Sequence, residues 1–146
     1  MIVYLDSSAL VKCYADESGA LDTVDLLDGA EMVATSPMTR VEVASALARA
    51  VRDGVLAPKA GREAFEAFRN EWPALIQVPA TERVLTRAQD LMWQSALRSY
   101  DAVHLASALI WRERVAQDVT LATFDRRLTA AAEAAGLPAW PGSSAT

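Results

Sequence analysis

The chain has 146 residues, of which 52% are hydrophobic and 23% are charged, the proportions of one compact domain rather than of a disordered or fibrous chain. The 14 Lys and Arg side chains are outnumbered by 19 Asp and Glu, so the net charge is −5. An acidic chain lacks the general attraction for phosphate backbones that basic proteins have. This argues against nucleic-acid binding, unless divalent cations at a carboxylate site add positive charge.

The single cysteine, Cys13, excludes an intrachain disulfide and a cysteine-based zinc site. The first ten residues, MIVYLDSSAL, lack the basic and apolar segments of a signal peptide. No apolar run approaches the roughly 18 residues of a membrane span. We therefore expect a cytoplasmic protein that does not associate with membranes.

Short apolar runs along the chain predict strands that are buried on both faces. The runs cover residues 2–5, 32–35, 75–78 and 119–122, and a weaker candidate covers 138–140. Longer segments between them have the 3.6-residue apolar spacing of helices. These predicted helices cover residues 41–51, a segment that starts near Pro58, and residues 81–95, 99–114 and 126–135.

Alternation of strands with helices predicts a mainly parallel sheet covered on both faces, a three-layer α/β/α sandwich. We expect residues 1–140 to form a single domain and residues 141–146 to form a flexible tail. In such sheets, ligands bind at the carboxyl ends of the strands, near the point where the strand order reverses. Candidate site residues should therefore follow strands directly or begin the crossover helices.

Four carboxylates occupy such positions. Asp6 and Asp125 follow the first and fourth predicted strands, whereas Glu42 and Asp101 lie in the first turns of crossover helices. Their mutual repulsion would be costly without a counter-charge. Mg²⁺ or Mn²⁺ suits a group of carboxylates without His or Cys. We expect Asp6 and Asp101 to be the principal metal ligands, with Glu42 and Asp125 completing the site or holding water.

A divalent ion near a phosphodiester activates water and stabilises the leaving oxygen, so this site predicts metal-assisted hydrolysis. The only histidine, His104, has no paired nucleophile at a recognisable spacing, which argues against a Ser-His-Asp mechanism. His104 follows Asp101 by three positions, and we expect it to be buried and hydrogen-bonded beside the site. Ser7 and Thr123 neighbour proposed ligands and either cap helices or support the carboxylates and metal waters.

Each of these residues also has a structural interpretation. Asp at a helix N-cap and acidic side chains in a first turn stabilise helices, so only the convergence of all four carboxylates favours a metal site. Arg40, Arg98 and Arg126, with the adjacent Arg127, are either solvated charges or phosphate contacts, and we favour phosphate. The tryptophans could stack on bases, but packing in the core or at a subunit interface is their commoner role and the one we expect; they are Trp72, Trp93, Trp111 and Trp140.

Four sequence segments resemble the PIN domain of VapC-type toxins, over nearly the whole chain. They are YLDSSALVK with Asp6, TSPMTRVEVASAL with Glu42, LRSYDAVHLASAL with Asp101 and His104, and LATFDRRLTAAAEAAG with Asp125. The resemblance implies an α/β/α fold, Mg²⁺- or Mn²⁺-dependent endoribonuclease activity, a homodimer, and inhibition by a cognate antitoxin. It also implies that the four carboxylates form the active site.

Two other enzyme and signalling classes do not fit these residues. A haloacid-dehalogenase-like phosphatase needs a second Asp two positions after the first, where this chain has Ser8. A receiver-like module needs a late lysine, but Lys12 and Lys59 both lie early. The remaining alternative is a non-catalytic α/β module whose acidic cluster binds a basic peptide. The RNA target is not encoded in any short motif here.

Overall fold

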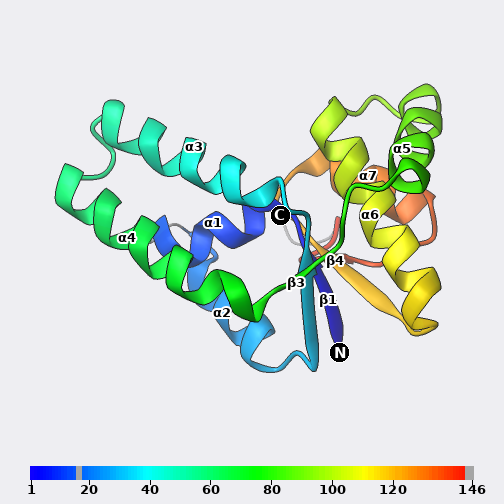
Figure 1. The fold of residues 1–146 in the computed structure, drawn as a ribbon, viewed down its shortest axis with the longest axis horizontal. Coiled ribbons are helices and arrows are strands. Elements are labelled where there is room, and N and C mark those ends of the chain that lie inside the picture. Colours follow the sequence, from blue (N-terminus) through cyan, green and yellow to red (C-terminus); the bar gives the residue numbers. More distant parts are fainter. Residues whose placement is uncertain (16–17, 144–146) are drawn as a thin grey trace.

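The computed structural model describes residues 1–15 and 18–143. Their strands form one five-stranded sheet in the order β3-β2-β1-β4-β5 (Figure 1). The strands are β1 (Ile2–Leu5), β2 (Met32–Thr35), β3 (Ile76–Gln77), β4 (Val119–Ala122) and β5 (Ala139–Trp140). Every neighbouring pair is parallel, so the predicted parallel sheet is confirmed.

Helices fill the connections between these strands. They are α1 (Ser7–Ala15), α2 (Ala20–Asp28), α3 (Thr39–Arg52), α4 (Pro58–Glu71), α5 (Glu82–Gln94), α6 (Ser99–Val115) and α7 (Arg126–Ala134). A 3₁₀ turn, Trp72–Ala74, follows α4. The sequence predicted the helices from α3 onward, and Thr81 caps α5 by accepting a hydrogen bond from the Val84 amide. It did not delimit α1 and α2, which are only nine residues long each.

The central strand β1 is buried on both faces and separates two apolar layers. Ile2 and Tyr4 pack in the layer that contains α5, α6 and α7. Val3 and Leu5 point the opposite way and pack against residues of α1, α3 and α4. Because alternate strand residues face opposite sides of a sheet, one four-residue strand supports both layers. The three-layer α/β/α sandwich is thus confirmed.

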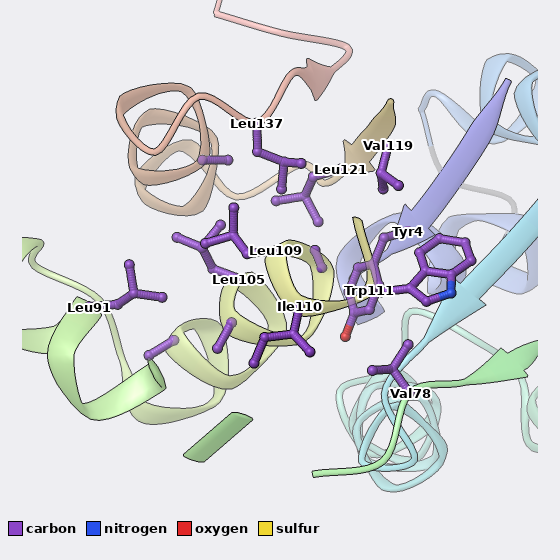
Figure 2. Packing of buried hydrophobic residues seen from close by; sticks show 14 of the residues in the cluster. Tyr4, Val78, Leu91, Leu105, Leu109, Ile110, Trp111, Val119, Leu121 and Leu137 are labelled. Carbon is purple, nitrogen blue, oxygen red and sulfur yellow. The ribbon is translucent and has the colours of Figure 1, made fainter. Parts of the chain in front are cut away.

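The larger of the two layers is organised around α6. Figure 2 shows Leu105 and Leu109 of α6 facing Leu121 of β4 and Leu137 beyond α7, and all four side chains are fully buried or nearly so. The buried middle of α6 thereby fixes the helix against the sheet, and with it the position of the α6 N-terminus.

The second layer contains a helical pair that projects away from the sheet. Figure 1 shows α3 and α4 running side by side, and both contact α1. A Cβ atom added to Gly61 of α4 would clash with the Val51 Cγ2 atom of α3, so the absence of a side chain at Gly61 permits the close approach of the two helices.

The strand order places two strand ends beside each other at the switch point of the sheet. The chain moves outward from β1 to β2 and β3, and then returns to add β4 on the other side of β1. The carboxyl ends of β1 and β4 are therefore adjacent, with Leu5 paired to Ala122. Ligands of open α/β sheets bind at this position.

The chain end beyond β5 is described as far as Ser143, whose hydroxyl donates a hydrogen bond of 2.6 Å to Glu133 of α7. Residues 144–146 of the predicted tail lie outside the described residues, and flexibility of residues 141–146 stays a prediction. No helix in the described part of the chain is long and apolar enough to cross a membrane.

Leu109→Ala should destabilise the domain because it leaves a cavity between α6 and the sheet. Substitutions of this kind cost about 2–5 kcal/mol, and urea denaturation followed by circular dichroism measures the change. Leu21→Ala is the matched control, since Leu21 is 81% exposed and should change stability little. Equal effects of the two substitutions would contradict the packing described here.

Candidate functional site

Asp6 directly follows β1 and is only 3% exposed. Its Oδ1 atom accepts a hydrogen bond from the Ser8 amide. Its Oδ2 atom accepts one from the Ser8 hydroxyl at 3.0 Å and another from the Thr123 hydroxyl. Ser8 belongs to α1 and Thr123 directly follows β4, so groups from the ends of both central strands fix the orientation of the Asp6 carboxylate.

Ser8 is a site residue that sequence reasoning missed. Besides contacting Asp6, its hydroxyl accepts a hydrogen bond of 2.9 Å from the Phe124 amide. Ser8 therefore ties the start of α1 to the loop after β4. Its signal in the sequence was a hydroxyl residue two positions after an Asp at a predicted strand end, a spacing that is typical of local side-chain-to-backbone turns.

Glu42 lies in the first turn of α3, and hydrogen bonds hold both of its oxygens. The Oε1 atom lies 2.7 Å from His104 Nε2, and the Oε2 atom accepts a bond of 3.0 Å from the Ser7 hydroxyl. Burial alone would raise the pKa of Glu42, but the hydrogen bonds and charge of His104, with smaller contributions from Ser7 and Arg98, hold the pKa below its ordinary value. Glu42 is therefore ionised at neutral pH.

Asp101 and Asp125 share one guanidinium. Arg98 Nε donates to Asp101 Oδ2 at 3.1 Å, and Arg98 Nη2 donates to Asp125 Oδ2 at 3.2 Å. Burial raises the pKa of Asp101; Arg98 opposes the shift, the charges of Asp125 and Asp6 add to it, and the pKa stays above its ordinary value. Burial is the main cause of this raised pKa, and repulsion by Asp125 and Asp6 adds a smaller part even with Arg98 in place.

Asp125 has a second partner besides Arg98. Its Oδ1 atom accepts a hydrogen bond of 2.9 Å from the Leu128 amide, which makes it the N-cap of α7. The structural interpretation of this residue from the sequence is therefore correct, and it does not exclude a role in the site. The oxygen that faces Arg98 is not the oxygen that caps the helix.

The predicted residues gather at the carboxyl edge as separate, linked pairs. Asp101 and Asp125 meet at Arg98, Glu42 is joined to His104 and Ser7, and Asp6 to Thr123. Within residues 1–15 and 18–143, no three His, Cys, Asp or Glu side chains converge closely enough to hold one metal ion. Assignment of the four carboxylates as metal ligands therefore stays a prediction.

The remaining candidates are scattered. Arg40 lies over the ring of Trp72 at 5.8 Å, and Arg126 is exposed at the start of α7. Trp72 and Trp111 are buried as expected. Trp93 is 93% exposed, so it does not pack in the core of this chain, and its packing at a subunit interface stays a prediction.

An open hollow of about 520 Å³ adjoins Glu42. Its lining includes Ser7 of α1, Val41 and Arg49 of α3, and Tyr100 of α6. Val41 and Tyr100 are both largely exposed. A ligand can therefore reach the Glu42 side of the carboxyl edge past an aromatic ring and a guanidinium.

Comparison with known proteins gives a family match over most of the chain. The PIN domain family model matches residues 3–134, which include all four carboxylates. The chain belongs to the PIN domain family. Among curated proteins, this PIN domain is 37% identical over 135 residues to ribonuclease VapC45 of Mycobacterium tuberculosis, and the match covers 92% of each chain.

Solved structures show the same fold at lower identity. The PIN domain superposes on Mycobacterium tuberculosis VapC20, a toxin that cleaves the sarcin–ricin loop, with a TM-score of 0.64, 16% identity, and coverage of 88% of this chain and 94% of that one. A toxin–antitoxin complex from Klebsiella pneumoniae gives a TM-score of 0.64 at 18% identity, covering 88% and 90%. At these identities, the likeness establishes the fold alone.

Asp125→Ala should destabilise the PIN domain by about 1 kcal/mol because α7 loses its N-cap. Asp125→Asn should keep most of that stability, since Asn caps helices as well as Asp does. Chemical denaturation in the presence of a chelator measures both variants without any metal contribution. Equal stability of Asp125→Ala and the unchanged protein would contradict the capping role.

Proposed function

We propose that this PIN domain is a metal-dependent endoribonuclease and the toxin of a toxin–antitoxin pair. The observation that carries the proposal is the gathering of Asp6, Glu42, Asp101 and Asp125 at the switch point of the sheet. Support comes from relatives named as VapC ribonucleases that match over 92% of the chain. We infer that the chain acts in the cytoplasm, where RNA and an antitoxin would meet it.

The donor chemistry of the edge fits Mg²⁺, and also Mn²⁺. All four candidate ligands offer carboxylate oxygens, whereas the His104 ring nitrogens face Glu42 and Tyr4. Cys13 lies in α1, and burial raises the pKa of its thiol to about 11. The Arg98 guanidinium forms ion pairs with both Asp101 and Asp125, so positive charge between these two carboxylates is stabilising. We propose Asp6 and Asp101 as the principal ligands, with Glu42 and Asp125 completing the site.

Such an ion, when bound, supplies a Lewis acid that activates water and offsets the charge of the phosphodiester. The chain provides the rest of the site. Ser8 and Thr123 orient Asp6, and Ser7 orients Glu42. Arg98 is 72% exposed, so its long side chain is able to turn from the carboxylates to a phosphate of bound RNA.

Further contacts with RNA are proposed along the same edge. Tyr100 lines the hollow beside Glu42 and offers a ring for stacking of an unpaired base. Arg40 and Arg126 are exposed and are proposed as phosphate contacts on either side of the site. These few cations and the metal allow an acidic chain to hold RNA, although its overall charge is −5.

We also propose a cognate antitoxin and a homodimer. The structural neighbours include toxin–antitoxin complexes, which supports the first partner. The position of Arg98 supports it physically, because it demonstrates that a guanidinium fits between Asp101 and Asp125. An antitoxin arginine inserted there would make charge-assisted contacts and compete with the metal.

The same observation favours the alternative function, a non-catalytic module that binds a basic peptide through the acidic edge. A peptide-binding module needs the negative charge of Asp101 but no metal. Cleavage of RNA therefore distinguishes the two functions directly.

Purified protein should cleave RNA with Mg²⁺ or Mn²⁺, and excess chelator or Asp101→Asn should abolish cleavage because the ion loses its ligand. Gel analysis of a mixed RNA substrate measures this. Asp90→Asn is the matched control, since Asp90 is exposed on α5 and should keep full activity. Cleavage that survives both the chelator and Asp101→Asn would exclude the metal mechanism.

Arg98→Gln should increase the thermal stabilisation that Mn²⁺ gives the protein. Without the guanidinium, Asp101 and Asp125 repel each other more strongly, and the ion then relieves more repulsion. Thermal unfolding with and without Mn²⁺ measures the shift in Tm. Arg83→Gln removes an equally exposed, ion-paired arginine on α5 and should leave the Mn²⁺ shift unchanged. If Mn²⁺ raises the Tm of Arg98→Gln and Arg83→Gln by the same amount, the proposal that a bound cation takes over the role of the Arg98 charge is contradicted.

A further inference from the structure

A chain of hydrogen bonds connects the core of the sheet to the carboxyl edge. The Tyr4 hydroxyl lies 3.1 Å from His104 Nδ1, and His104 Nε2 lies 2.7 Å from Glu42 Oε1. The Ser7 hydroxyl holds the second oxygen of Glu42 at 3.0 Å. Four elements contribute to the chain, since these residues belong to β1, α6, α3 and α1.

The histidine in this chain has no access to water. His104 is 1% exposed and Tyr4 is fully buried, and their rings meet edge to face at 6.0 Å. A buried polar nitrogen needs a hydrogen-bond partner in the protein, because a nitrogen without one pays the full desolvation penalty. The hydrogen bonds with Tyr4 and Glu42 occupy both ring nitrogens, so the orientation of the imidazole is determined.

The carboxylate partner determines the direction of one of these hydrogen bonds. The Tyr4 hydroxyl, 3.1 Å from Nδ1, is able to donate or accept there, so it suits either protonation state of the ring. The Glu42 carboxylate only accepts. His104 therefore donates its Nε2 hydrogen to Glu42, as the partner of a carboxylate must.

Glu42 needs such a partner because its side chain would otherwise be free to turn. A glutamate has three rotatable side-chain bonds, and Glu42 borders the open hollow of about 520 Å³. Its backbone lies on the exposed start of α3, which does not fix the carboxylate. Ser7 holds one oxygen only, from a short side chain at the start of α1.

We propose that His104 is a positioning residue that, braced by Tyr4, holds the Glu42 carboxylate in the orientation used at the active site. The inference rests on the proposed function for its catalytic consequence, but the hydrogen-bonded clamp is a property of the folded chain alone. His104 acts only through Glu42 and touches neither RNA nor metal.

The clamp is testable without any activity measurement, because the chain contains a single histidine. In tag-free protein with ¹⁵N-labelled histidine, NMR should show a hydrogen on Nε2 that exchanges slowly with water. Glu42→Gln should shift the Nε2 resonances, and Tyr4→Phe should shift those of Nδ1. A ring without a hydrogen on Nε2, or an Nε2 signal unchanged by Glu42→Gln, would overturn the proposal.

The catalytic consequence is measured on RNA with saturating Mn²⁺. His104→Ala should lower kcat about 10–100-fold, the usual effect of removing a partner of a metal-site residue. His104→Gln should recover part of the loss, because its amide is able to donate to Glu42. Ile110→Val is the control, since it alters a buried side chain of α6 that does not contact Glu42, and it should keep the full kcat.

The two parts of the experiment separate the clamp from the proposed function. Full kcat in His104→Ala, or no recovery in His104→Gln when both variants are folded, would overturn the positioning role. If the unchanged protein cleaves no RNA with either ion, the proposed function fails, while the NMR measurement still decides whether His104 holds Glu42.

Discussion

Carboxylates at one edge of a sheet repel each other, and each must find a positive or hydrogen-bonding partner to remain ionised. In this PIN domain, the partners differ from one carboxylate to the next. Asp6 receives hydroxyl and amide hydrogens, Glu42 receives His104 and Ser7, and Asp101 and Asp125 share Arg98. Burial, with a smaller contribution from the charges of Asp125 and Asp6, keeps the pKa of Asp101 raised although a guanidinium lies beside it. A divalent cation would stabilise the buried charge and offset the repulsion, which is the physical basis of the proposed metal site.

The fold is what forces the carboxylates together. Strand β1 is buried on both faces and lies between β2 and β4, so the residues after β1 and β4 lie side by side. The packing of α6 against the sheet then brings Arg98, Asp101 and His104 to the same edge, and α3 brings Glu42. Each apolar layer thus positions part of the site: His104 comes from the layer of α6, and Glu42 and Ser7 come from the layer of α1 and α3.

Much of this arrangement was predictable from the sequence because it depends on local patterns. Apolar runs predicted the strands, and the positions of Asp6, Glu42, Asp101 and Asp125 relative to strands and helices predicted the edge at which they lie. Side-chain partners were less predictable, since they depend on contacts between distant segments. Nothing near Tyr4 in sequence indicates that its hydroxyl meets His104, 100 residues away. Trp93 is likewise a large apolar side chain of the kind that usually packs in a core. Only the structure shows that it lies exposed on α5.

The central claim is that the carboxyl edge binds a divalent cation through its carboxylates. The most direct measurement is a crystal structure of the protein soaked in Mn²⁺, with anomalous diffraction to locate the ion. We expect an anomalous peak in contact with Asp6 and Asp101, and an Arg98 side chain that no longer bridges Asp101 and Asp125. Absence of a peak at this edge at saturating Mn²⁺, with Arg98 still bridging the two carboxylates, would contradict the claim.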